Sequence, residues 1–192
     1  MSPRSKKQFE QIRKSKKALI IEKALELFAN NGFHNTSINM IASGAGISKG
    51  LIYNYFNSKE DLIKEIVFKG IDELILNIFD PNKDGVLTDE EFVFFINECF
   101  DILKKKIEFW KLYFAIIIQP NVMKLVERKL FELVSPLFII LEKYFKAKGI
   151  KNPKAEARLF GAIMDGISLN YIVDPDNFPL DTIKDIIIEK YS

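Results

Sequence analysis

Hydrophobic residues recur at helical spacing along almost the whole chain, and the alternation that marks a half-buried strand is nearly absent. Ile21, Leu25 and Phe28, for example, form an apolar stripe in a predicted helix over residues 15–31. The same periodicity predicts later helices that begin near residues 36 and 48, and others over 58–79, 88–109, a short stretch ending near 119, 121–148, 155–173 and from about 180 onwards. The pattern therefore predicts an all-α fold.

Residues 38–56 contain two short helical patterns separated by a glycine turn. Gly46 suits the left-handed position just past the first helix, and the Ser48 hydroxyl can cap the second by accepting a backbone N–H. In the second helix Leu51 and Ile52 are apolar, while Ser48, Lys49, Tyr53 and Asn54 are polar and free to point outward. This arrangement is typical of a helix-turn-helix, whose second helix lies in the DNA major groove.

The residue types at these helix starts suit contacts with DNA. Hydroxyl and backbone donors at a helix start can bind a phosphate, an asparagine amide can pair with adenine, and a glycine lets the backbone come close to the duplex. Alternatively, Ser48 could serve only as a helix cap and the tyrosines only as packing residues, without any role in DNA binding. The candidate DNA-binding residues are Thr36, Ser37, Ser48, Lys49, Gly50, Tyr53, Asn54 and Tyr55.

The string GFHNTSINMIASGAGISKGLIYNYFNSKEDL, residues 32–62, resembles the DNA-binding signature of the TetR family of bacterial transcriptional regulators. The resemblance implies a helix-turn-helix domain over residues 1–62, joined by a long helix to a helical ligand-binding and dimerisation domain over 63–192. It also implies a phosphate contact by Lys59. The expected partners are a double-stranded DNA operator, a small-molecule effector and a second copy of the chain.

Charge is distributed unevenly, although the net charge is only +2. Residues 1–60 carry a balance of +6 and residues 61–192 one of −4, as expected for a basic DNA-facing part beside a mildly acidic one. One cysteine and one histidine make a zinc site or a Cys–His catalytic pair improbable, and no other catalytic set is visible, so we expect no enzyme. The longest apolar run, 112–118, is too short to span a bilayer, and a cytoplasmic location is expected.

A second motif, DPNKDGVLTDEE over residues 80–91, fits the calcium loop of an EF-hand. Gly85 takes the sharp-turn position, and oxygen ligands of the kind calcium prefers follow the usual spacing. The candidate ligands are Asp80, Asn82, Asp84, the Val86 carbonyl, Thr88 and Glu91. A turn followed by a helix capping box would explain most of these letters without metal. Calcium is therefore an optional ligand, and a calcium-responsive regulator is the alternative function.

The C-terminal two-thirds of the chain is rich in aromatic residues, which indicates either a helical core or the wall of an apolar cavity. The resemblance favours a cavity for a small apolar or aromatic effector that releases a repressor from its operator, although the lining residues cannot be identified. One face of the 155–173 helix carries small residues that permit close helix approach, or else packs inside the chain. The candidate dimerisation residues are Leu159, Ala162, Ile163, Gly166, Ile167 and Asn170.

Overall fold

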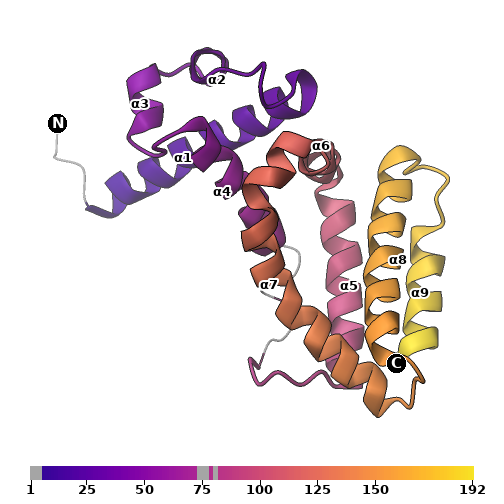
Figure 1. Ribbon diagram of the computed structural model, residues 1–192. Helices are drawn as coiled ribbons and strands as arrows, with labels where there is room; N and C mark the ends of the chain where they lie inside the picture. Colours follow the sequence, from indigo (N-terminus) through magenta and orange to yellow (C-terminus); the bar gives the residue numbers. More distant parts are fainter. Residues whose placement is uncertain (1–5, 73–77, 80–81) are drawn as a thin grey trace. The chain divides into compact units, whose positions relative to one another are not determined.

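The computed structural model describes residues 6–72, 78–79 and 82–192, and the regular structure within these ranges is entirely helical (Figure 1). The helices are α1 (Lys6–Asn31), α2 (Ile38–Gly44), α3 (Lys49–Tyr53), α4 (Lys59–Ile71), α5 (Asp89–Lys105), α6 (Ile107–Ile117), α7 (Pro120–Ala147), α8 (Pro153–Val173) and α9 (Leu180–Tyr191). The all-α prediction is confirmed. None of the described helices is long and apolar enough to cross a membrane.

Two helix boundaries differ from the sequence prediction by more than two residues. The first helix begins at Lys6 rather than Ser15, so the basic residues from Lys6 to Lys17 lie on a helix. The helix expected over 88–109 ends at Lys105, because Lys106 leaves the helical region of backbone space with φ −126° and ψ 33°. No glycine or proline marks that break. The predicted extension of the fourth helix to residue 79 passes through residues outside those described.

Backbone contacts divide the chain into two compact units. One contains the described residues up to 68 together with 112–126, and the other contains the described residues of 69–111 and 127–192. The first unit therefore includes the end of α6 and the start of α7, a segment that the predicted boundary at residue 62 assigned to the second domain. Its core includes Phe28, Ile41 and Ile52, whose side chains are completely inaccessible to solvent.

The second unit is built around an aromatic cluster contributed by α5, α7, α8 and α9. Phe92 stacks on Tyr144 with ring centroids 5.0 Å apart and an interplanar angle of 13°. Phe160 and Tyr191 make an edge-on contact at 5.5 Å, and all four rings are buried. These contacts show that much of the aromatic content predicted to form either a core or a cavity wall belongs to the core.

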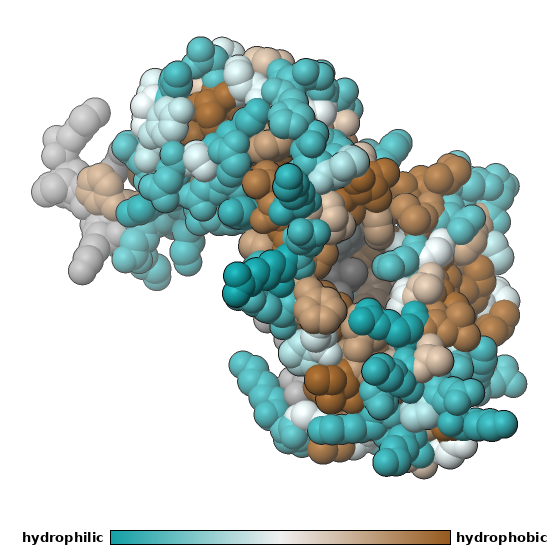
Figure 2. All heavy atoms as spheres, in the orientation of Figure 1, coloured by the Kyte–Doolittle hydropathy of each residue, from teal (hydrophilic) through white to brown (hydrophobic). Residues whose placement is uncertain are grey.

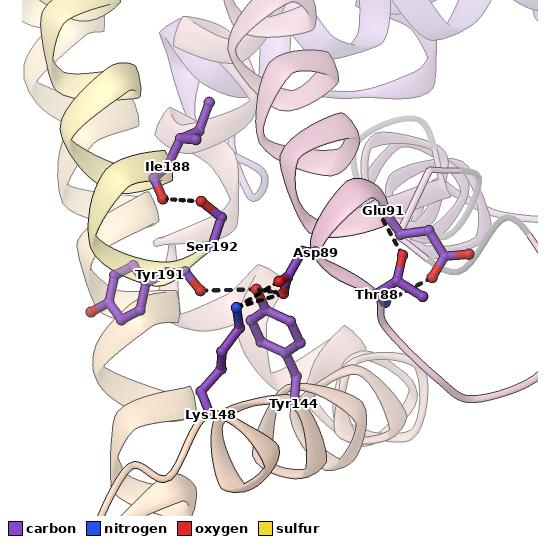
Figure 3. Close-up of polar contacts among 8 residues, drawn as sticks. All are labelled: Thr88, Asp89, Glu91, Tyr144, Lys148, Ile188, Tyr191 and Ser192. Carbon is purple, nitrogen blue, oxygen red and sulfur yellow. Dashed lines mark hydrogen bonds and ion pairs between the residues drawn. The ribbon is translucent and has the colours of Figure 1, made fainter.

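A polar network at the start of α5 closes one end of this cluster (Figure 3). The Asp89 carboxylate accepts a hydrogen bond from Lys148 Nζ at 2.7 Å, and the Tyr144 hydroxyl lies 2.9 Å from Asp89 and 2.8 Å from the Tyr191 carbonyl. The hydrogen bond from Lys148, and then the one from Tyr144, lowers the pKa of Asp89. Burial, with Asp89 beside it, raises the pKa of Tyr144. The network joins the first residue of α5 to the ends of α7 and α9.

Candidate nucleic-acid interface

The turn between α2 and α3 is fixed by local backbone chemistry. Ser37 caps α2 by accepting the Met40 N–H at 3.2 Å, and Ser48 caps α3 by accepting the Leu51 N–H at 3.2 Å. Between the two helices Gly46 has a φ of 62°, a conformation that residues with a Cβ rarely adopt. The predicted helix, glycine turn and capped second helix are therefore all present.

The short helix α3 has one buried side and one exposed side. Ile52 is completely buried, and Phe56 just beyond the helix is 2% exposed, so these two residues fasten α3 to the core of the first unit. Tyr53 is 47% exposed. The other exposed candidates on or beside the helix are Ser48, Lys49, Gly50 and Asn54. The residue types that suit base and phosphate contacts thus face solvent, while the apolar ones hold the helix in place.

Tyr55 is half-buried and lies beside the N-terminal part of α1. The Arg13 guanidinium is 5.8 Å from the centre of its ring, and Lys17 Nζ is 5.5 Å from the ring of Phe56. Lys17 also pairs with Glu65 at 2.5 Å. The basic half of α1 therefore lies next to the end of α3, where exposed cations such as Arg13 can add to the attraction for phosphates.

Thr36 does not present its hydroxyl to solvent. Its side chain is completely buried, and the hydroxyl lies 3.0 Å from the Leu27 carbonyl and 2.9 Å from the Gly32 carbonyl. A phosphate contact by this hydroxyl, which the sequence suggested, is not supported, because the group already serves the loop between α1 and α2. Ser37, the next residue, is exposed and remains a candidate.

Lys59, at the start of α4, points its ammonium group into the same loop. Lys59 Nζ donates to the carbonyls of Phe33 at 2.7 Å and Thr36 at 2.9 Å, and lies 4.4 Å from the centre of the Phe33 ring. The ammonium is therefore already engaged with protein atoms. A phosphate contact by this side chain stays a prediction and would have to be made in addition to, or in place of, these bonds.

The described part of the EF-hand-like loop has the sharp turn of an EF-hand, and it also has the helix capping box that would explain the sequence without metal. Gly85 adopts a φ of 72°, and the Asn82 amide donates to the Glu91 carboxylate at 2.6 Å. Thr88 and Glu91 form a capping box at the start of α5 (Figure 3). Asp80 lies outside the described residues, and the described residues contain no group of three His, Cys, Asp or Glu side chains that could hold a metal ion.

Calcium binding by this loop therefore stays a hypothesis, supported by its spacing and by the turn at Gly85. Calorimetric titration with calcium tests it directly. A site would give a heat of binding in the parent protein and none in Glu91→Gln, because the variant loses the bidentate carboxylate. A parent protein that gives no heat would remove calcium from consideration.

The predicted dimerisation face of α8 is partly exposed. Leu159 is 48% exposed, and apolar side chains are visible over α8 and α9 in Figure 2. Ile167, in contrast, is only 8% exposed, so little of its side chain is available to a partner, and its role in dimerisation stays a prediction. Leu169 and Val173, 43% and 82% exposed, continue the exposed face and were not among the residues predicted from the sequence. The remaining candidates are exposed or half-buried: Ala162, Ile163, Gly166 and Asn170.

One shallow groove of about 460 Å³ beside the turn between α7 and α8 is lined by charged residues that include Glu142, Lys154 and Arg158. That lining does not match the apolar cavity expected from the sequence.

Comparison with protein families places the first unit in a known class of DNA-binding domains. Residues 20–66 match the family model described as bacterial regulatory proteins, tetR family. The N-terminal part of the chain thus carries the helix-turn-helix domain of that family, and the predicted resemblance is confirmed there.

Curated relatives align over the same part of the chain. The fatty acid metabolism regulator protein of Bacillus subtilis (strain 168) is 31% identical over 84 residues, covering 44% of this chain and 43% of the relative. The HTH-type transcriptional regulator UidR of Escherichia coli (strain K12) is 36% identical over 62 residues, covering 32% of each chain. These alignments span less than half the length of either relative.

Solved structures resemble the chain over nearly its whole length. FadR from Bacillus subtilis, in complex with stearoyl-CoA, superimposes with a TM-score of 0.70 at 20% identity and covers 90% of this chain and 95% of its own. NalD from Pseudomonas aeruginosa gives a TM-score of 0.71 at 21% identity, with 93% and 96% covered. At such low identity these similarities establish the fold.

Proposed function

We propose that the protein is a ligand-responsive, DNA-binding transcriptional regulator that acts as a homodimeric repressor. The observation that carries the proposal is the division of α3 into a buried anchor, Ile52, and an exposed polar face that includes Lys49 and Tyr53. An anchored helix with polar residues at its exposed start is what major-groove recognition requires. The match of residues 20–66 to the TetR-family model supports the same conclusion.

The homodimer forms through the exposed face of α8. Leu159, Ala162, Gly166, Leu169 and Val173 recur at alternating intervals of three and four residues along the helix, which places them on one stripe. A two-fold pair of such chains would offer recognition helices to half-sites about 34–36 Å apart on a near-palindromic operator.

Release from the operator follows binding of an apolar small molecule by the second unit. The support is indirect. This unit is rich in aliphatic and aromatic side chains, and a relative of the same fold has been solved with stearoyl-CoA. A long acyl chain is therefore the first effector class to test, and aromatic compounds are the second. An effector would act by favouring a conformation whose recognition helices no longer match the operator.

Selection of bound fragments from the source genome tests the proposal. The parent protein should enrich a small set of near-palindromic fragments, and the double variant Lys49→Ala with Tyr53→Ala should enrich none. Lys129→Ala, at an exposed position in α7, is the matched control and should select the same fragments as the parent. Selection that is unchanged in the double variant would show that α3 does not read the DNA.

The same selection discriminates the alternative function. Repeating it with calcium and with a chelator tests whether the 80–91 loop regulates binding. If the selected fragments differ between calcium and chelator, a calcium-responsive regulator is favoured. If they are the same, the effector-responsive repressor is favoured.

A further inference from the structure

A glutamine far along the chain takes part in the DNA-binding unit. Gln119 lies in the short connection between α6 and α7, and residues 112–126 belong to the same compact unit as the helix-turn-helix. Its side-chain Oε1 accepts the Phe33 N–H at 3.0 Å, and its Nε2 donates to the Phe28 carbonyl at 3.1 Å. These partners are 86 and 91 residues away in sequence. One carboxamide therefore binds both the last turn of α1 and the loop that follows it.

The orientation of this carboxamide is determined by its neighbours. The second Nε2 hydrogen faces the Ala115 carbonyl at 3.1 Å, so both amide hydrogens point to carbonyls and the oxygen points to an N–H. A flipped amide would place its N–H groups against the Phe33 N–H. The Gln119 backbone is held as well, because its carbonyl accepts the N–H groups of Val122 and Met123, each at 2.9 Å. Hydrogen bonds therefore fix both the backbone of Gln119 and the direction of its side chain.

Phe33 is also held by Lys59, the first residue of α4. Its N–H goes to Gln119, its carbonyl accepts from Lys59 at 2.7 Å, and its buried ring packs against Phe28 with centroids 5.4 Å apart. Lys59 also binds the carbonyl of Thr36, and the next residue is the cap of α2. A single loop of about five residues therefore connects the Gln119 contact to the start of the helix-turn-helix.

We infer that Gln119 is a positioning residue for DNA binding, which holds the 32–37 loop in the conformation that presents α2 and α3. The inference rests on the proposed function and adds to it a residue outside the family-matched segment 20–66. Gln119 need not touch DNA. By fixing the loop before binding, it lowers the ordering cost that a looser loop would have to meet on the operator.

Three variants of the full-length protein separate the parts of this inference. Gln119→Leu keeps the size of the side chain and removes its hydrogen bonds. Gln119→Glu keeps an acceptor but turns a carboxylate toward the carbonyls of Phe28 and Ala115. Asn121→Leu changes an exposed residue two positions further on and serves as the control.

We expect Gln119→Leu to weaken binding to the selected fragment about tenfold, as the loss of one to two net hydrogen bonds would do. The slope of log Kd against log salt should not change, because no phosphate contact is lost. Hydrogen exchange at the Phe33 N–H should accelerate, and Asn121→Leu should behave as the parent. A Gln119→Leu protein with the parent's Kd and the parent's Phe33 exchange would overturn the inference.

In Gln119→Glu, lowering the pH should restore part of the lost DNA affinity. At pH 5 a growing fraction of the glutamate is protonated and can donate to one carbonyl, whereas at pH 8 the carboxylate repels both. The Kd of the variant relative to the parent should therefore fall as the pH falls, and this measurement decides the question if Gln119→Leu does not fold. A ratio that is independent of pH would contradict the positioning role of Gln119. If the parent protein selects no DNA, the proposed function fails, but hydrogen exchange at the Phe33 N–H still reports whether Gln119 holds the loop.

Discussion

Gly50 offers a perturbation that should raise stability and lower function at once. It lies at the second position of α3, is exposed, and does not use the left-handed backbone region. Apart from its chain neighbours and the backbone of its own helix, a Cβ built on it would meet no atom within 4 Å. Nothing in the free protein therefore opposes Gly50→Ala, and the gain is that of replacing glycine by alanine in an exposed helix, about 0.5–1 kcal/mol.

The same methyl group would lie on the side of α3 that is proposed to enter the major groove. If the backbone at Gly50 approaches the duplex to van der Waals distance, the added Cβ must push the helix outward and disturb neighbouring contacts by Lys49 and Tyr53. We expect affinity for the selected fragment to fall by at least tenfold, a loss of about 1.4 kcal/mol in binding free energy. Stability and affinity should thus change in opposite directions.

Urea unfolding and a fluorescence anisotropy titration measure the two quantities on one preparation. Asn30→Ala, at an exposed position near the end of α1, is the control, because it improves helix propensity by a similar amount away from α3. It should stabilise the protein and leave the Kd unchanged. A Gly50→Ala protein that binds the fragment as tightly as the parent would refute close backbone approach at this position.

Three further outcomes are expected. Ile52→Ala, which empties a completely buried position beneath α3, should cost about 2–5 kcal/mol in urea unfolding, and a cost below about 1 kcal/mol would mean that Ile52 does not anchor the helix. Because the pKa of Asp89 is lowered, its contribution to stability is present above about pH 4 and is lost as the pH falls through the folded-state value. Asp89→Asn should therefore destabilise the protein at pH 7, and this effect should shrink as the pH falls below about 4; an effect that is independent of pH would contradict the pairing with Lys148. Gly166→Ala, where an added Cβ also meets open space, should weaken self-association in sedimentation experiments, and an unchanged dimer would place the interface elsewhere.

Local chemistry explains which parts of this structure the sequence could predict. Ser48 and Gly46 act on backbone groups within a few residues of themselves, so the capped helix and the turn before it follow from the letters alone. Apolar spacing likewise identifies Ile52 as buried and leaves Tyr53 exposed. The exposed face of α3 was therefore predictable.

Contacts between distant segments were not predictable in this way. The sequence suggests Thr36 as a phosphate ligand at a helix start, but in the structure its hydroxyl lies within hydrogen-bond distance of the carbonyls of Leu27 and Gly32. Nothing in the letters around Gln119 indicates that its amide meets Phe33, because that pairing depends on how the helices pack. The break at Lys106 also lacks a glycine or proline signal. Sequence patterns of this kind report local preference, whereas these features arise from tertiary packing.

The central claim is that the exposed face of α3 reads a DNA sequence. The most direct measurement compares the Kd for a selected fragment with the Kd for a scrambled fragment of the same length, at one salt concentration. For the parent protein we predict a ratio of at least about 10³, as specific regulators show, and for Lys49→Ala with Tyr53→Ala a ratio that approaches one. A parent ratio near one, or a ratio that the double variant leaves intact, would contradict the claim.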